Sequence, residues 1–166
     1  MEDPRLLGDI YAAPYAHFEP DLAFVLDDGA DQAVGYVLGA LDTTAFEARC
    51  EAEWWPALRA RHPVRPDGTR LDDLFIHLLH HRGGHATDVV GTHPSHLHVD
   101  LLPEVQGDGW GRRMMETLFD ALRTAGSAGV HWGVSTANRS ALGFYRHLGA
   151  DELAADELTV TFGVRL

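Results

Sequence analysis

The chain has 166 residues, of which 45% are hydrophobic and 23% charged, and its net charge is −12. This balance is typical of a globular domain with a substantial core and excludes a disordered chain. The acidity argues against nucleic acid as a partner, because phosphate contacts need a basic surface, and it mildly favours a cationic partner such as an amine. Without an apolar run of about 18 residues or a signal-peptide pattern, we expect a cytoplasmic protein that does not contact membranes. The single cysteine, Cys50, allows no internal disulfide and fits a reducing compartment.

The N-terminal part predicts short helices followed by a β-hairpin. Residues 1–20 carry apolar side chains at near-helical spacing between prolines, so we expect short helical segments that pack on the body. Two apolar runs, 21–26 and 33–41, flank an Asp-Asp-Gly turn and predict the two strands of the hairpin. Gly35 and Gly39 in the second run indicate a bulge or a close approach of neighbouring atoms.

Two helices are expected next. Residues 43–61 repeat apolar side chains every four residues, and Pro56 kinks or restarts this helix. Residues 71–81 predict the second helix, and 81–94 predict a loop. We expect five apolar residues to form the buried face of the second helix: Leu71, Leu74, Phe75, Leu78 and Leu79.

The stretch from residue 96 to 111 predicts a strand, a glycine-rich turn and the start of a helix. Side chains alternate up to residue 102, with His96, His98 and Asp100 on one face and Leu97, Val99 and Leu101 on the other. Pro103 ends the strand. Three glycines at alternate positions then let backbone N–H groups turn inward at a helix N-terminus, which is a typical anion site. Arg112 and Arg113 follow in the first helical turn, where they are either solvated or help to hold that anion.

Strands and helices alternate in the rest of the chain. A helix follows the glycine turn, and residues 130–136 predict the next strand. Asn138 is placed to cap a further helix that Gly149 ends, and residues 157–166 predict a final strand. This order, without internal repeats or linkers, predicts a single mixed α/β domain over residues 1–166 around one sheet.

Two sequence blocks resemble the motifs of the GNAT superfamily of N-acetyltransferases. Gln106-x-x-Gly109-x-Gly111 resembles its acyl-CoA pyrophosphate signature, and 138–149 resembles its Asn-x-x-Ala-x-x-Phe-Tyr-x-x-Leu-Gly motif. The resemblance implies the GNAT fold, an α/β (α+β) arrangement. Its central mixed, mostly antiparallel, twisted sheet is flanked by helices, and its central strands are splayed at the acetyl-CoA site.

The resemblance narrows to the acetyltransferase-like C-terminal domain of O-GlcNAcase and its stand-alone bacterial homologues. Three parts of the chain carry it: the hairpin with Phe24-Val25-Leu26 and 35–39, the helix 46–54, and the stretch 112–129. We expect no glycoside hydrolase portion, because nothing here is long enough for a barrel.

The resemblance implies that acetyl-CoA is the cosubstrate and that this stretch binds it. Backbone amides of the turn would hold the pyrophosphate, and Arg112 would extend that contact. The turn residues concerned are Gln106, Gly107, Asp108, Gly109, Trp110 and Gly111. Backbone groups of Leu101 and Leu102 would bond the pantetheine arm as a short extra strand. Asn138 would reach the pantetheine or acyl side, serve as a helix cap, or both.

Two residues are the candidate catalytic pair. Tyr145 matches the tyrosine that often faces the CoA sulfur, and its ordinary pKa of about 10 lies close to a thiol's 8.5; the alternative is a core aromatic. Asp100 is our first candidate for the base and His98 the second, through water; the alternative for Asp100 is a carboxylate paired with an arginine. No glutamate lies on this strand, since Glu104 follows Pro103, and the strand therefore departs from the pattern of the histone-modifying GNAT enzymes, which act on protein lysines.

The histidines and tryptophans favour structural interpretations. Seven of the eleven histidines lie between residues 77 and 98: His77, His80, His81, His85, His93, His96 and His98. Although His77 and His81 have a metal-compatible spacing, no Glu or Cys accompanies them, and we predict no metal site. Trp55 is expected in the core, or else in the acceptor cleft as one wall of a cation box.

Three functions are consistent with these residues. The first is an acetyl-CoA-dependent N-acetyltransferase in which an unidentified amine, on a small molecule or a protein, attacks the thioester directly. The alternative is a catalytically weak or inactive acetyl-CoA-binding module, a pseudo-acetyltransferase. The third is a structural or dimerisation domain with a vestigial pocket, and a homodimer is compatible with any of the three.

Overall fold

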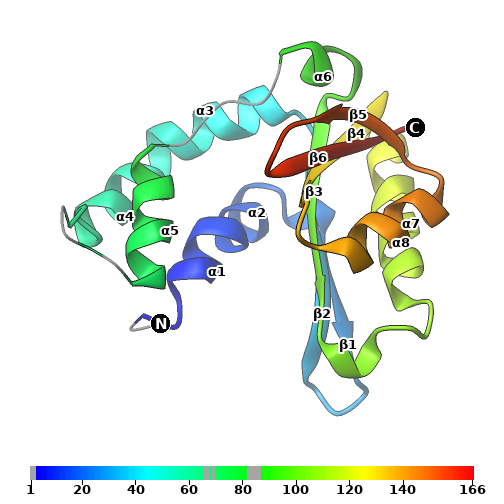
Figure 1. Ribbon diagram of the computed structural model, residues 1–166, viewed down its shortest axis with the longest axis horizontal. Helices are drawn as coiled ribbons and strands as arrows, with labels where there is room; N and C mark the ends of the chain where they lie inside the picture. The colour runs from blue at the N-terminus through cyan, green and yellow to red at the C-terminus, as the bar shows by residue number, and fades with distance from the viewer. Residues whose placement is uncertain (1–2, 66–67, 69, 82–86) are drawn as a thin grey trace.

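A six-stranded sheet runs through the part of the chain that the computed structural model describes, residues 3–65, 68, 70–81 and 87–166 (Figure 1). The strands are β1 (Ala23–Asp27), β2 (Ala33–Ala40), β3 (Ser95–Leu101), β4 (Gly129–Ser135), β5 (Asp151–Ala155) and β6 (Thr159–Arg165). Their order across the sheet is β1-β2-β3-β4-β6-β5. All neighbours are antiparallel except β3 and β4, which are parallel.

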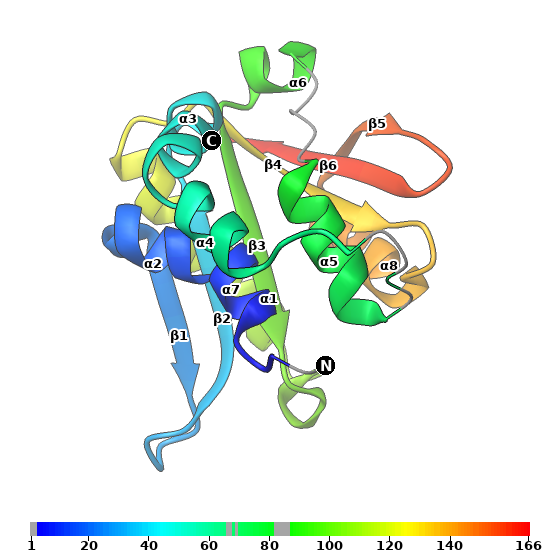
Figure 2. The same ribbon diagram turned by 90° about the vertical axis from the view of Figure 1, so that its left-hand side faces the viewer.

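Helices cover both faces of this sheet (Figures 1 and 2). The α-helices are α1 (Leu6–Tyr11), α2 (Ala13–Phe18), α3 (Thr43–Glu53), α4 (Trp55–Arg61), α5 (Leu71–His80), α6 (Thr87–Thr92), α7 (Trp110–Thr124) and α8 (Arg139–Leu148), and two short 3-10 turns are η1 (Pro20–Leu22) and η2 (Pro103–Val105). Side chains of α7 and α8 form one core with the sheet. Those of α1 to α5 form a second core against β2.

Capping residues fix the helix ends where the sequence predicts them. Asp42 accepts a hydrogen bond from the N–H of Ala45 at the start of α3. Asn138 accepts one from the N–H of Ala141 at 3.1 Å, and Gly149 ends α8 with a φ of +88° in the left-handed region. The predicted cap and stop of this helix are both confirmed.

The pairing between β3 and β4 is short, and this opens the sheet at its centre. Only two residue pairs join them, Ser95 with Val130 and His96 with His131. β3 remains paired with β2 as far as Leu101, and β4 remains paired with β6 over its whole length. The two central strands therefore diverge towards their C-terminal ends, as the predicted splay requires.

A buried hydrogen-bond network around His96 stabilises the end of the sheet where β3 and β4 are still paired. Thr43 donates its only hydroxyl proton to the carbonyl of Pro94 at 2.7 Å, so Nδ1 of His96 must donate to Thr43 Oγ at 2.9 Å. In a neutral imidazole Nε2 of His96 is then the acceptor, and the hydroxyl of Tyr15 donates to it at 2.6 Å. His96 is thus a buried, hydrogen-bonded core residue, and it shares a face of β3 with His98 and Asp100, as the alternation predicts.

Two expectations about the helical part need correction. The loop expected over 81–94 contains α6. Leu71, Leu74 and Leu78 are exposed on α5, whose buried residues are Asp72, Ile76 and Leu79. The core position expected for Trp55 is confirmed, since it is buried in the core of the helical part. On the other side of the molecule, β5 was not predicted.

The close approach expected at Gly35 is present, and it gives a stability test. A Cβ at this position would overlap the side chain of Leu101 and lie 3.0 Å from the carbonyl oxygen of Asp100. We expect Gly35→Ala to lower the free energy of unfolding by about 1–3 kcal/mol, because the β3 backbone must shift. Gly143→Ala is the matched control, since a Cβ there meets nothing within 4 Å and Ala favours a helix. Urea denaturation that gives equal stability for both variants would contradict this account.

Candidate active site

A cavity of about 680 Å³ occupies the opening between β3 and β4. Its walls come from the diverging strands, from the glycine turn before α7, and from α8. The lining residues are Val99, Asp100, Leu101, Gln106, Gly107, Gly109, Gly111, Arg112, Gly133, Val134, Ser135, Asn138, Ser140, Ala141, Phe144, Tyr145 and His147. The two sequence blocks, which are far apart in the chain, thus meet at one site.

The edge of β3 offers backbone groups to this cavity. Leu102 donates its N–H to the carbonyl of Val34 on β2 at 2.9 Å, and in an antiparallel pair this orientation alternates along the strand. The N–H and C=O groups of Leu101 and Val99 therefore point away from β2, towards the gap. Leu102, by contrast, has already donated its N–H and lies outside the cavity lining.

Both the N–H and the C=O of Leu101 have hydrogen-bond partners nearby in the chain. Its carbonyl accepts a hydrogen bond from Nε2 of Gln106 at 2.8 Å, which ties the turn to the strand. Its N–H lies 3.0 Å from Oδ1 of Asp100. An acyl oxygen that bonds to this N–H must therefore displace the carboxylate of Asp100.

The glycine turn presents unbonded N–H groups at the start of α7. Gly107 and Gly109 have φ values of +93° and +80°, a backbone conformation that favours glycine. The first intrahelical bond runs from Arg113 N–H to Gly109 C=O at 3.2 Å, and no side chain caps the helix. The N–H groups of residues 110–112 therefore lack helical partners, and together with the helix dipole they suit an anion.

Side chains around the turn have divided roles. Arg112 donates to the carbonyl of His147 at 3.4 Å, which brings a cation to the cavity wall between α7 and α8. A Cβ at Gly111 would come within 3.2 Å of the ring of Phe144, so glycine is needed for these helices to approach. Asp108 and Trp110 lie outside the lining, and the ring of Trp110 packs under the guanidinium of Arg113.

Tyr145 is a buried aromatic residue, as its core interpretation predicts, and it also lines the cavity. It is 7% exposed, and its ring lies 5.1 Å from Trp132 and 5.0 Å from Phe144 between centroids. Burial, followed by the negative charge of Asp100, raises the pKa of Tyr145 to about 12. Its hydroxyl therefore stays protonated throughout the physiological pH range.

Asp100 is exposed on β3 and lines the cavity as well. Its cross-strand neighbour is Tyr36, whose pKa is raised by burial and then by the carboxylate of Asp100. Within the described residues Asp100 forms no ion pair with an arginine, which was its structural alternative. His98, the second candidate base, contacts the rings of Tyr11 and Tyr15.

The β4 side of the cavity was missed at the sequence level. Gly133, Val134 and Ser135 line it, together with Ser140 and Ala141 of α8. The strand predicted at residues 130–136 follows the helix after the glycine turn, so a parallel position next to that turn could have indicated that β4 residues line the site. The part of the chain that is described shows no group of three metal-ligating side chains and no helix able to span a membrane. His85 lies outside the described residues.

Comparisons with known proteins agree with this geometry. Residues 2–150 match the model of the acetyltransferase (GNAT) family. The crystal structure of SsHAT is 44% identical, with a TM-score of 0.89, over 99% of this chain and 82% of that one. An agmatine N-acetyltransferase shares the fold, with a TM-score of 0.52 and 23% identity over 87% of this chain and 74% of its own.

Protein O-GlcNAcase of Rattus norvegicus is 27% identical over 161 residues, which are 95% of this chain, and the match to that of Mus musculus is the same. The chain spans only 17% of the length of these relatives. The chain belongs to the acetyltransferase (GNAT) family, and its class is that of an acyltransferase.

Proposed function

We propose that this chain moves the acetyl group of acetyl-CoA to a primary amine by direct attack. The observation that carries the proposal is the opening between β3 and β4, which joins an anion-binding turn to the strand-edge backbone of β3 in one cavity. This shape suits an extended cosubstrate with a pyrophosphate at one end and a thioester at the other. In proteins of this family, acetyl-CoA is the usual acyl donor.

The cosubstrate is held mainly by backbone groups in this account. The pyrophosphate takes the N–H groups at the start of α7, and Arg112 adds a charge at the cavity wall. The pantetheine arm lies along the gap edge of β3, where Leu101 and Val99 offer their backbone groups. The N–H of Leu102 takes no part in holding the arm, because it is already donated to Val34.

The reaction forms a C–N bond and breaks a C–S bond. The amine nitrogen attacks the thioester carbon, and the N–H of Leu101 is placed to polarise the carbonyl oxygen. The acceptor arrives as an ammonium and must lose one proton before it attacks, and we assign the acceptance of this proton to Asp100, with His98 through water as the second candidate. A second proton leaves the nitrogen for solvent as the amide forms. When the thioester oxygen accepts the hydrogen bond from the N–H of Leu101, the carboxylate of Asp100 loses this bond and is free to accept the proton.

Tyr145 stabilises the departing sulfur, and its raised pKa decides between donating a hydrogen bond and transferring its proton. Full proton transfer from a phenol of pKa about 12 to a thiolate of ordinary pKa about 8.5 is uphill by about 5 kcal/mol. Tyr145 therefore donates a hydrogen bond to the sulfur and keeps its proton, and the thiolate is protonated from solvent after it leaves.

We expect Tyr145→Phe to lower kcat by about 10- to 100-fold, the value of one hydrogen bond to a charged group, while the acetyl-CoA Kd stays within about threefold. Because the protonated phenol is the active form and persists below pKa 12, wild-type kcat should not fall between pH 8 and pH 10 through Tyr145. Steady-state kinetics across this range tests both points. An alkaline loss of rate that disappears in Tyr145→Phe would contradict the assignment.

An acetyl-CoA-binding module without transfer activity is the second candidate. The hydrogen bond from Leu101 N–H to Asp100 favours it, because a carboxylate that is never displaced would block the acyl oxygen. Free-thiol release with acetyl-CoA and a panel of amines, with the acetylated product identified by mass spectrometry, separates the two. Amine-dependent thiol release supports transfer; acetyl-CoA binding without it supports the inactive module.

A further inference from the structure

The carboxylate of Asp100 depends on a hydrogen bond that acetyl transfer would remove. In the described chain, the N–H of Leu101 is the only hydrogen-bond donor to this carboxylate, at 3.0 Å. In the proposed reaction the acyl oxygen takes that N–H. A general base must be held within hydrogen-bond reach of the proton that it accepts. Asp100 therefore needs a second donor to direct its carboxylate at the moment when it acts.

Tyr36 of β2 is the side chain that the sheet places beside Asp100. Because the N–H of Leu102 is bonded to the carbonyl of Val34, alternate pairs of β2 and β3 exchange backbone hydrogen bonds, and Tyr36 with Asp100 is the next such pair. Their Cα atoms are about 5.5 Å apart, and their side chains share one face of the sheet. At this spacing an aromatic side chain reaches its cross-strand neighbour.

The hydroxyl of Tyr36 is a protonated and available donor. Burial, followed by the negative charge of Asp100, raises the pKa of Tyr36, so the phenol keeps its proton at neutral pH. This hydroxyl makes no hydrogen bond to any part of the chain that the structure describes. The ring packs against the core of the helical part, which limits the directions in which the hydroxyl can point.

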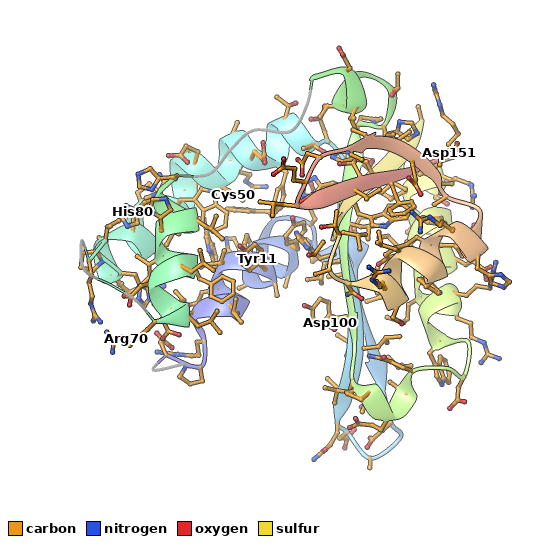
Figure 3. The ribbon with its side chains drawn as sticks, in the orientation of Figure 1. Tyr11, Cys50, Arg70, His80, Asp100 and Asp151 are labelled. Atoms are coloured by element: carbon orange, nitrogen blue, oxygen red, sulfur yellow. The ribbon has the colours of Figure 1, made fainter. Side chains whose placement is uncertain are left out.

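The other titratable side chains near Asp100 have different partners. His98 shares the face of Asp100, but its ring lies edge to face with those of Tyr11 and Tyr15. Figure 3 shows Asp100 on β3 and Tyr11 on α1, the helix that His98 contacts. Tyr145 packs in the core on the α7 and α8 side, where the proposed reaction places the departing sulfur. Tyr36 is therefore the donor best placed to hold the carboxylate.

We propose that Tyr36 is a positioning residue that acts through Asp100, an inference that rests on the proposed acetyl transfer. When the acyl oxygen takes the N–H of Leu101, the hydroxyl of Tyr36 donates a hydrogen bond to one carboxylate oxygen. The other oxygen then faces the acceptor nitrogen and takes its proton, while Tyr36 keeps its own. Tyr36 thus lets Asp100 exchange its backbone partner for the acceptor without losing its orientation.

Kinetics with matched variants tests this role. Thiol release is measured with acetyl-CoA and, as amine probes, 2-phenylethylamine and spermidine. Tyr36→Phe, which removes only the hydroxyl, should lower kcat about 10-fold and leave the amine KM and the acetyl-CoA Kd within about threefold. Tyr36→Leu should lose no more than about threefold beyond this. Tyr11→Phe, which removes a phenol hydroxyl near His98 and keeps the ring contacts, is the control and should leave kcat unchanged.

Carbon NMR of the Asp100 carboxyl group tests the contact without turnover. Asp100→Asn identifies the resonance, and spectra are recorded with and without saturating acetyl-CoA, in the absence of amine. Tyr36→Phe should move this resonance more with acetyl-CoA than without it, because the contact forms only when the acyl oxygen takes the N–H of Leu101. Such a conditional shift supports the inference even if no thiol is released with either amine, in which case only the transfer proposal fails.

Three results would overturn the inference. The first is an Asp100 resonance that is the same in wild type and Tyr36→Phe when acetyl-CoA is bound. The second is an active Tyr36→Phe enzyme with wild-type kcat, which would mean that the ring alone matters. The third is an equal loss of kcat in Tyr11→Phe, since the effect would then not depend on the neighbour of Asp100.

Discussion

Gly109→Glu is expected to weaken acetyl-CoA binding by at least 100-fold, which corresponds to about 2.7 kcal/mol. Gly109 precedes α7 with a φ of +80°, and it lines the cavity. A glutamate there would direct its carboxylate at the N–H groups that the pyrophosphate needs and would repel the phosphates. Isothermal titration of the two proteins with acetyl-CoA measures the change.

Gly126→Glu is the matched control at the other end of the same helix. Gly126 has a φ of +89°, and a Cβ there also meets open space, so the backbone penalty is comparable. Gly126 lies outside the cavity lining, so the Gly126→Glu protein should bind acetyl-CoA as tightly as the wild type. Equal weakening by both glutamates would show that the loss comes from strain alone and would contradict the anion site.

Asp100→Asn is expected to lower kcat by about 10²- to 10⁴-fold, the usual value of a general base, with acetyl-CoA affinity within a few-fold of the wild type. The amide keeps the shape and can still accept a hydrogen bond from Leu101, but it cannot take a proton from the amine. Thiol-release kinetics at saturating amine, together with calorimetry, separates turnover from binding.

Two further variants complete this experiment. Asp120→Asn removes an exposed carboxylate near the C-terminal end of α7 that pairs with Arg123, and it should leave kcat unchanged. His98→Gln, which removes the second candidate base, should lower kcat less than Asp100→Asn does. If Asp100→Asn is fully active and His98→Gln is not, the proton goes to His98 and our assignment is reversed.

The sequence predicted those parts of the fold that depend on local chemistry. Asn138 and Gly149 delimit α8 because a cap and a left-handed glycine act on their own neighbours. The turn at 106–111 was also predictable, since alternate glycines before an apolar helix leave few other conformations. The divergence of β3 and β4 came from the family resemblance, because no local pattern encodes where two distant strands separate.

Other features depend on what covers a surface, which periodicity alone does not reveal. The apolar spacing on α5 predicted an inward face, but tertiary packing buries Ile76 and Leu79 and leaves Leu71 and Leu78 exposed. The alternation on β3 placed His96 on a polar face, although Tyr15 and Thr43, both distant in sequence, bury and satisfy it.

The candidate site was predictable to the same limited extent. Motif positions such as Gly109 and Tyr145 do line the cavity, because the motif fixes the backbone around them. The raised pKa of Tyr145 needed the tertiary structure, since it arises from burial and from Asp100, 45 positions away in the chain. The hydrogen bond of Leu102 to Val34 likewise depends on strand register.

Residue-resolved hydrogen exchange with and without acetyl-CoA tests the central claim most directly. We predict that saturating acetyl-CoA slows exchange of the amides of Val99 and Leu101 on the gap edge of β3, and that Leu102, already bonded to Val34, changes little. Acetyl-CoA that binds and protects amides elsewhere, while leaving Val99 and Leu101 unchanged, would contradict a cosubstrate held between the two diverging strands.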